Sequence, residues 1–550
     1  MSVTKLKEVN YLPFVIYGAL LITLIITPWV NVDSMIIPKQ IILFLLASFL
    51  IPPLIKSINK DQFRLFQQVF LLVALVSFQF IIVLILSNSP WEQQIFGRTG
   101  RGLGLITYLS LLILYLYVLL NSQKKHLDMI LSSLVVSCAV SSVYSTIQFF
   151  GKDIFAWTTK TNGIIGTLGN PNFQSSLAAM ALIPTLVFFW KRKFGYLFSI
   201  VTTSFLLFII FITRSTQGYI TALVAIFVFL IIFLWSRKMH IPVIVLSLFW
   251  LSSSIIALLG MLNKGILSYY LYKPSVRSRG DFWRSAFESA NDSPIFGHGI
   301  DSFADNYLLY RDERAATGIG EFTDNAHNFY LEFATNGGYP LAIYMLLLSL
   351  ITLSSFIRYL RALDYFDYKM SALFTAWVVF QLQSFISPAN ISMLVWNTII
   401  SSFLVSIHKT SISAEKNSQK TPKLKSTTNL TSSLLMTTLA CLVIYPLFNT
   451  DRLQLKSSQT RDALLAVEVS KMYPESTLRY SRLGSAMLES NLPVQALEIG
   501  RAAIDFNPNA VSGWALILAN QSAPIDERKK AAKKIIDLDP YNKIVKDFNF

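Results

Sequence analysis

Thirteen apolar stretches are the feature of this 550-residue sequence that most constrains its fold. Each is about long enough to cross a bilayer, which takes roughly 17–25 residues in a helix. Because hydrocarbon offers no partner to the backbone, a spanning segment must satisfy its own hydrogen bonds and is expected to be helical. The stretches lie near 11–30, 36–55, 66–87, 102–120, 127–150, 173–190, 195–212, 219–235, 241–260, 333–357, 369–387, 390–407 and 430–449. The sequence therefore predicts an all-α, polytopic membrane protein with about 12–13 transmembrane helices.

The charged residues divide the chain into parts. Residues 450–550 hold 14 Lys and Arg and 12 Asp and Glu, whereas the 449 residues before them hold only 33 and 19. A soluble domain carries roughly 25% charged residues, so only the C-terminal part has a soluble composition. We expect a polytopic domain over 1–408 that includes an extracytoplasmic loop at 261–332, a cytoplasmic basic linker over 409–429, a last transmembrane helix at 430–449 and a small extracytoplasmic domain over 450–550.

The basic residues predict the orientation of the chain in the membrane. Alternate connections between the stretches, beginning with Lys5 and Lys7, carry 20 basic and 6 acidic residues, and the intervening connections before residue 450 carry 13 of each. Positive charge concentrates on the cytoplasmic side of membrane proteins. The N-terminus is therefore expected in the cytoplasm and the C-terminal domain outside it. The formal net charge of +16 is thus a topology signal, which argues for contact with membrane lipids and against a nucleic-acid partner.

The C-terminal part shows a repeat. Pro474, Pro508 and Pro540 each follow a helix-like run, at spacings of 34 and 32 residues. A helix-turn-helix unit that recurs near 34 residues is typical of tetratricopeptide repeats. Such repeats form concave surfaces that bind other proteins, so we expect a repeat domain with a possible protein partner. Packing against the membrane domain alone is the other interpretation.

The long connection from Met261 to about Glu332 is the first place to look for chemistry, because long loops in compact domains are usually functional. Of the five histidines, only His298 and His327 fall in this predicted outer loop. His327 lies between Asn325 and Asn328, just before a predicted span. An imidazole with an ordinary pKa can accept a hydroxyl proton at neutral pH. A merely solvated or hydrogen-bonded histidine is the alternative interpretation.

The same side of the membrane is predicted to carry five arginines close to span ends. A guanidinium group matches phosphate oxygens in a bidentate way, so arginines that converge at the outer leaflet favour a lipid diphosphate as ligand. Snorkelling to lipid headgroups is the alternative for each. The five are Arg98, Arg101, Arg214, Arg277 and Arg279.

The acidic residues of the long loop show no calcium-loop spacing, and we expect them to be solvated surface charges without a metal site. They are Asp281, Asp301, Asp305, Asp312, Glu313, Glu321 and Asp324.

Several segments, in order, resemble the O-antigen ligase/polymerase superfamily of membrane glycosyltransferases. The resemblance covers roughly residues 90–400. It rests on FGRTGRGLGLITYL, on GTLGNPNFQSSLAAM, on RGDFW with Arg279 four residues before Trp283, on PIFGHG, on AHNFYLEF and on QLQSFISPAN.

The resemblance implies a GT-C-like fold in a bacterial cytoplasmic (inner) membrane and a role in cell-envelope polysaccharide synthesis. The implied reaction transfers a glycan from undecaprenyl diphosphate to an acceptor hydroxyl on a glycan, lipid or protein, without metal, nucleotide or other cofactor. By motif, His327 is the expected base and Arg279 the main ligand of the diphosphate, with Asn325, Asn328 and Trp283 in support.

Two other functions stay open at this point. A transporter or flippase of lipid-linked sugars would favour inverted repeats and charges near the bilayer midplane, and the notable charges lie instead at span ends. A membrane-anchored scaffold would use the C-terminal repeats but gives no reason for the arginines and histidine of the long loop.

Overall fold

The structure, a computed structural model, describes residues 10–155, 157, 163–190, 195–317, 322–416 and 427–546. All regular elements in these ranges are helices. The predicted topology signals at Lys5, Lys7 and the basic group at 191–193, together with Glu321 and residues 417–426 of the linker, lie outside the described residues.

Each of the thirteen predicted spans corresponds to a helix. Among the described residues, ten helices are long and apolar enough to cross a membrane: α2 (Ile37–Ser57), α4 (Gln67–Leu86), α7 (Leu127–Phe149), α8 (Pro171–Trp190), α9 (Gly195–Ile212), α10 (Thr216–Ser236), α11 (His240–Met261), α16 (Phe329–Arg361), α18 (Ile391–Lys416) and α19 (Thr427–Thr460). Two shorter apolar helices are α1 (Leu12–Leu24) and α6 (Leu105–Asn121). The thirteenth, α17 (Tyr368–Ser384), packs between α8, α10 and α18. The protein is an all-α, polytopic membrane protein, as predicted.

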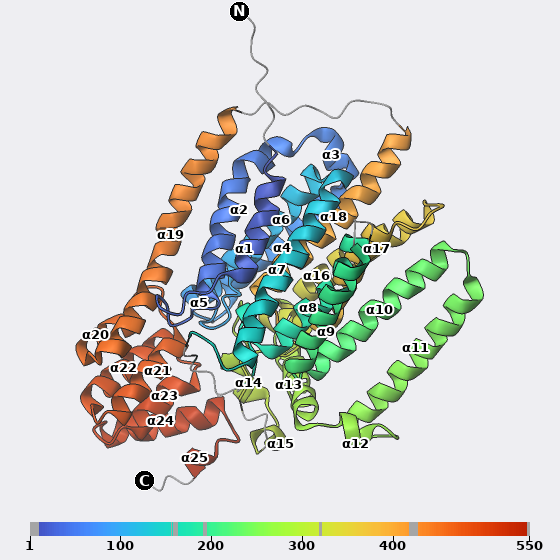
Figure 1. Cartoon of the computed structure of the whole chain (residues 1–550). Helices are drawn as coiled ribbons and strands as arrows, with labels where there is room; N and C mark the ends of the chain where they lie inside the picture. Colours follow the sequence, from blue (N-terminus) through green and yellow to red (C-terminus); the bar gives the residue numbers. More distant parts are fainter. Residues whose placement is uncertain are drawn as a thin grey trace, which may run out of the picture.

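The long helices form one bundle (Figure 1). Helix α6 packs on α2 and α18, and α16 packs on α4 and α18, around a continuous apolar core that includes Phe80, Phe333 and Trp396. Helices α10 and α11 form a hairpin that leans out from the bundle, with α11 packed mainly on α10 (Figure 1). Their outer faces are apolar, as lipid contact requires.

The long loop folds into a small helical cap, here defined as residues 268–316. It contains α12 (Ser268–Leu271), α13 (Pro274–Asp292), α14 (Phe303–Tyr310) and α15 (Glu313–Ala316). The cap has a core of its own, in which Phe282, Phe303 and Tyr307 pack together with Ala326. Since α13 also packs along α16, the cap is fixed to the end of the bundle.

Helix α16 breaks at Gly337 and Gly338, where the backbone leaves the helical region and Gly338 has φ 74°. The break receives the Pro294–Gly299 turn: the Tyr339 N–H donates to the Pro294 carbonyl at 2.8 Å, and the Gly299 N–H to the Asn336 carbonyl at 3.1 Å. A Cβ at position 338 would collide with the backbone of Ile295, so glycine is required there. The turn thereby separates the first two turns of α16 from the rest of the helix.

The C-terminal helices continue from α19, which runs through the predicted boundary at 449/450 without a break. They are α20 (Ala463–Ser470), α21 (Thr477–Glu489), α22 (Pro493–Phe506), α23 (Val511–Ala519), α24 (Ile525–Leu538) and α25 (Lys543–Lys546). Helices α22 and α24 end at Phe506 and Leu538, just before Pro508 and Pro540 as predicted, whereas α20 ends at Ser470, well before Pro474. Successive helices from α21 to α24 pack on one another, and the group lies at the same end of the bundle as the cap (Figure 1).

Candidate functional site

His327 occupies a tight corner between the cap and α16. Its backbone has φ 50°, a left-handed conformation that is costly for a residue with a side chain. Two neighbouring amides hold it: the Asn325 Oδ1 accepts from the His327 N–H at 2.9 Å, and the Asn328 Oδ1 caps α16 by accepting from the N–H groups of Tyr330 and Leu331 at 3.0 and 3.1 Å. The two amides therefore fix the backbone on either side of the histidine.

The His327 ring stacks on Phe282 of α13, with ring centroids 5.3 Å apart. Its Nδ1 is buried and has no hydrogen-bond partner. Burial and then the positive charge of Arg279 lower the pKa of His327 from 6.5 to about 4, against an opposing effect of Asp324. The imidazole is therefore neutral at pH 7, with a lone pair or N–H at Nδ1 available to a ligand.

Arg279 and Trp283 are four residues apart on α13 and thus lie on one face of the helix. The Arg279 Nε and the Trp283 Nε1 are buried without partners, like the Nδ1 of His327. Burial lowers the pKa of Arg279, and no carboxylate of the described residues pairs with it. Buried polar atoms without partners are uncommon. Three of them on adjoining segments indicate a place for a polar, anionic ligand.

Arg101 lies at the centre of a buried charge cluster. Its Nε is 3.2 Å from the Asp301 carboxylate, its Nη2 pairs with Glu332, and its Nη1 donates to the Asp324 carbonyl at 3.2 Å. Burial opposes the charge of Arg101, but Glu332 and Asp301 raise its pKa above the usual value. Burial raises the pKa of Asp301. The cluster joins the 97–104 loop to the cap and to the first turn of α16.

The 97–104 loop is closed by glycine. Gly97 has φ 84°, and a Cβ there would collide with the backbone N of Leu103. Inside this loop the Arg98 N–H donates to the Asp301 Oδ2 at 2.8 Å, and the Arg98 Nη1 pairs with the Asp305 Oδ1 at 2.7 Å. The FGRTGRG segment thus binds the carboxylates of Asp301 and Asp305 in the cap.

One sequence expectation needs correction here. Asp301, Asp281 and Asp305 were expected to be solvated, but their side chains are only 2%, 5% and 6% exposed. Each pairs with an arginine because the loop folds into a cap. Arg98 and Arg101, for which the sequence predicts a diphosphate ligand, pair with Asp305 and Asp301 in the structure.

Glu332 and Phe282 were not singled out from the sequence. The available signal for Glu332 was the cost of placing Arg101 at a span end without a counter-charge. For Phe282, which stacks on His327, no signal was present.

Arg214 and Arg277 are exposed, and within the described ranges no hydrogen bond or ion pair joins them to the group around His327. Arg214 lies in the α9–α10 turn with φ 52°. The next residue, Ser215, donates to the Asn172 Oδ1 at 2.7 Å. Gln217 accepts from Ser387 at 2.6 Å, so two of the quoted segments meet at this turn.

His298 ties the cap to α16. Its ring Nε2 lies 2.9 Å from the Ser289 carbonyl, and its backbone N–H donates to the Thr335 carbonyl at 2.9 Å. These contacts give His298 a structural role in holding the cap against α16. No group of three His, Cys, Asp or Glu side chains in the described ranges is arranged to hold a metal ion.

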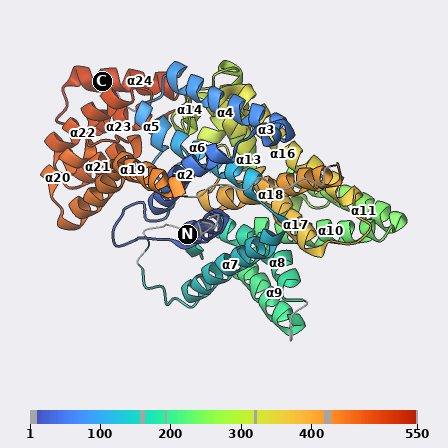
Figure 2. The same cartoon turned by 90° about the horizontal axis from the view of Figure 1, so that it is seen from above.

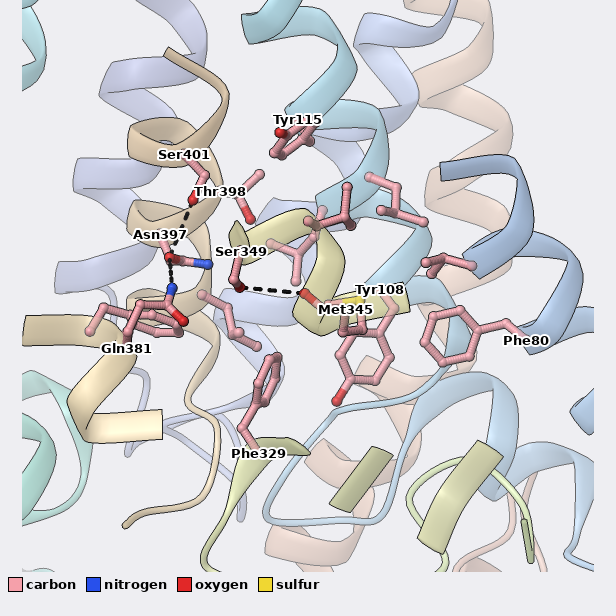
Figure 3. A pocket seen from close by; sticks show the side chains of 16 residues that line it. Phe80, Tyr108, Tyr115, Phe329, Met345, Ser349, Gln381, Asn397, Thr398 and Ser401 are labelled. Carbon is pink, nitrogen blue, oxygen red and sulfur yellow. Dashed lines mark hydrogen bonds between the residues drawn. The ribbon is translucent and has the colours of Figure 1, made fainter. Parts of the chain in front are cut away.

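A cavity lies inside the bundle beside the start of α16, between an aromatic wall that includes Phe80, Tyr108 and Phe329 and a polar wall on α17 and α18 (Figure 3). The Tyr330 hydroxyl donates to the Gln381 Oε1 at 2.8 Å, and the Gln381 Nε2 donates to Asn397 at 3.1 Å. Buried polar networks of this kind fix the elements that they join. Tyr330, three residues after His327, is thus anchored in the bundle.

Comparison with known proteins was informative for one segment. No curated protein matches the chain. Residues 201–346, which are 146 of the 550, match the family model described as O-antigen ligase. The matched segment contains Arg214, Arg279, Trp283 and His327, and it supports the O-antigen ligase/polymerase superfamily for this part of the chain.

Proposed function

We propose that the protein transfers a glycan from undecaprenyl diphosphate to an acceptor hydroxyl at the extracytoplasmic surface of the bacterial cytoplasmic membrane. The observation that carries the proposal is the neutral Nδ1 of His327 beside Arg279, two groups that find neither a hydrogen-bond partner for the Nδ1 nor a carboxylate for the arginine within the described ranges. This pair lies where the cap meets the start of α16, at the end of the bundle, within the segment that matches O-antigen ligases.

In the proposed reaction the acceptor oxygen attacks the anomeric carbon of the donor. The bond from that carbon to the phosphate oxygen breaks, and the diphosphate leaves with the electron pair. Arg279 stabilises the leaving group, for which a preorganised donor is worth about 3–4 kcal/mol. The acceptor proton passes to the Nδ1 of His327, a general-base step that typically contributes about two to four decades of rate.

The other predicted residues take secondary parts. Trp283 offers its unpartnered indole N–H to the donor, and the exposed Arg214 and Arg277 supply further positive charge for the diphosphate. Arg98 and Arg101 act through the carboxylates that they bind. No metal or nucleotide is needed, because the diphosphate is already an activated leaving group. The C-terminal helices, as tetratricopeptide-like repeats, favour a protein acceptor or partner over lipid A core, growing polymer or wall polymer.

The test is incubation of the purified protein with an undecaprenyl-diphosphate glycan and each class of acceptor, followed by analysis of the product linkage. Transfer is expected in the wild type, with EDTA present, and is expected to be abolished by His327→Ala and by Arg279→Ala. Arg501→Ala, at an exposed arginine of the C-terminal helices, is the control. Full activity of purified His327→Ala would overturn the mechanism, and movement of the donor between leaflets without cleavage would indicate a transporter.

A further inference from the structure

The C-terminal helices contact the cap through a buried ion pair. The Arg311 Nη2 lies 2.9 and 2.8 Å from the two carboxylate oxygens of Asp539, and its Nε is 3.2 Å from the first. The two side chains are only 4% and 1% exposed. Arg311 follows α14 and Asp539 follows α24, and these helices lie side by side (Figure 2). A bidentate pair with so little exposure fixes both position and angle.

A second contact reaches the 97–104 loop. The Asn507 Nδ2, after α22, donates to the Asp305 Oδ2 at 3.1 Å. The other oxygen of Asp305 accepts from Arg98 at 2.7 Å. Beside it, the hydroxyls of Thr99 and Ser476 are 2.7 Å apart. The same face of the C-terminal helices therefore holds the loop and the cap together.

The cap carries this constraint to His327. Asp312 and Arg314, the near neighbours of Arg311, pair with Arg284 and Asp281 of α13. Helix α13 presents Phe282, on which His327 stacks, and one turn earlier Arg279. The end of α24 is thus connected to the imidazole through the Arg311–Asp539 ion pair, the ion pairs of Asp312 and Arg314 with α13, and α13 itself.

We propose that the C-terminal helices are a structural part of the active site, in which Asp539 and Asn507 are positioning residues that hold the cap against the 97–104 loop. This inference rests on the proposed function for its kinetic consequence. It gives the C-terminal helices a task besides binding a partner. Asp539 touches no reacting atom. It sets the distance from α13 to α16, and a displacement of about 1 Å in an active site can cost about a hundredfold in rate.

The ion pair allows a test that separates positioning from general damage. Removing one member of a buried pair leaves an uncompensated charge, whereas removing both is often mild. Asp539→Asn and Arg311→Gln are therefore each expected to lower kcat about 10- to 100-fold with little change in KM for the donor, and the double variant to recover much of the loss. Glu527→Gln, in the exposed pair with Arg501 of the same helices, is the matched control and is expected to behave as wild type.

Hydrogen–deuterium exchange of the full-length protein supplies a readout that is independent of activity. Asp539→Asn is expected to raise exchange in peptides from 274–292 and 303–316, and the double variant is expected to raise it less. The inference is overturned if exchange rises only within 463–546, if the losses of the two single variants add in the double variant, or if kcat is unchanged. If the wild type transfers no glycan, the proposed function fails, and the exchange measurement still decides whether the C-terminal helices hold the cap.

Discussion

The low pKa of His327 leads to a sharp prediction about pH. The groups that act on the ring are Arg279 of α13, Asp324 of its own loop and Arg101 of the 97–104 loop, in addition to burial. In the free protein the pKa is about 4 instead of 6.5. At pH 5 about 90% of His327 is then neutral, compared with about 3% for an ordinary histidine. We therefore expect kcat/KM for transfer to stay nearly constant from pH 8 to pH 5 and to fall only below that range.

The same shift predicts a change in stability, and its sign is fixed. Because the folded-state pKa is lower, the unfolded chain binds more protons between pH 6.5 and 4, so stability is full above 6.5 and is lost as the pH falls towards 4. At pH 5 the loss from His327 is at most about 2 kcal/mol. His327→Gln removes this loss, so the free energy of unfolding of the wild type should fall by up to about 2 kcal/mol more than that of the variant between pH 8 and pH 5.

Two measurements check this reasoning. The first is the pH profile of kcat/KM, which reports groups of the free enzyme, for wild type and for His298→Gln as a histidine control. The second is unfolding of wild type and His327→Gln in the same buffers. An acid limb near pH 6.5 that His298→Gln does not move, or parallel losses of stability in both proteins, would refute a neutral, buried His327.

Three further predictions concern the arginines and the glycine loop. Arg279→Gln should lower kcat/KM about 10²–10³-fold, with Arg279→Lys between it and wild type because a charge remains but the fork is lost; equal activity of all three would exclude a diphosphate contact. Asp301→Asn should lower the free energy of unfolding by about 3–5 kcal/mol, because Arg101 loses a buried partner, and unfolding within 0.5 kcal/mol of wild type would contradict this. Gly97→Ala should prevent accumulation of folded protein. Gly100→Ala should lower the free energy of unfolding by only about 1–2 kcal/mol, because Gly100 has φ 88° but no atom lies within 4 Å of its Cβ. The yields of folded protein of the two variants can be compared by size-exclusion chromatography.

The spans were predictable because the bilayer imposes one rule on all of them. Even α17, which is too short to count as a span by length and composition, coincides with the apolar stretch at 369–387. The ends of α22 and α24 were predictable for a local reason, since proline cannot continue a helix. The break at Gly337 and Gly338 was not predictable, because the break accommodates the Pro294–Gly299 turn, which lies some forty residues earlier in the chain.

The site was also predictable only in part. Features set by neighbouring residues could be predicted, whereas those set by residues far away in the chain could not. His327 could be singled out because Asn325 and Asn328 adjoin it, and these amides do fix its backbone. The burial and ion pairing of Asp301 could not be predicted, because its partner Arg101 is 200 residues away and acidic residues in loops are more often solvated. The low pKa of His327 likewise depends on Phe282 and Arg279 from another helix.

Which arginine can bind a diphosphate depends on its carboxylate neighbours more than on its place in a motif. Arg98, Arg101, Arg284, Arg311 and Arg314 are all paired with Asp or Glu. Arg279 is part-buried, yet among the described residues its guanidinium makes only a weak hydrogen bond, from Nη1 to the Ser275 carbonyl at 3.4 Å. A charge kept from water without a counter-ion is costly unless a ligand neutralises it. A dianionic diphosphate would do so and would also raise the pKa of His327, since it would offset the effect of Arg279. Donor binding would then turn a weak base into a stronger one, so the acid limb of kcat should lie at a higher pH than that of kcat/KM.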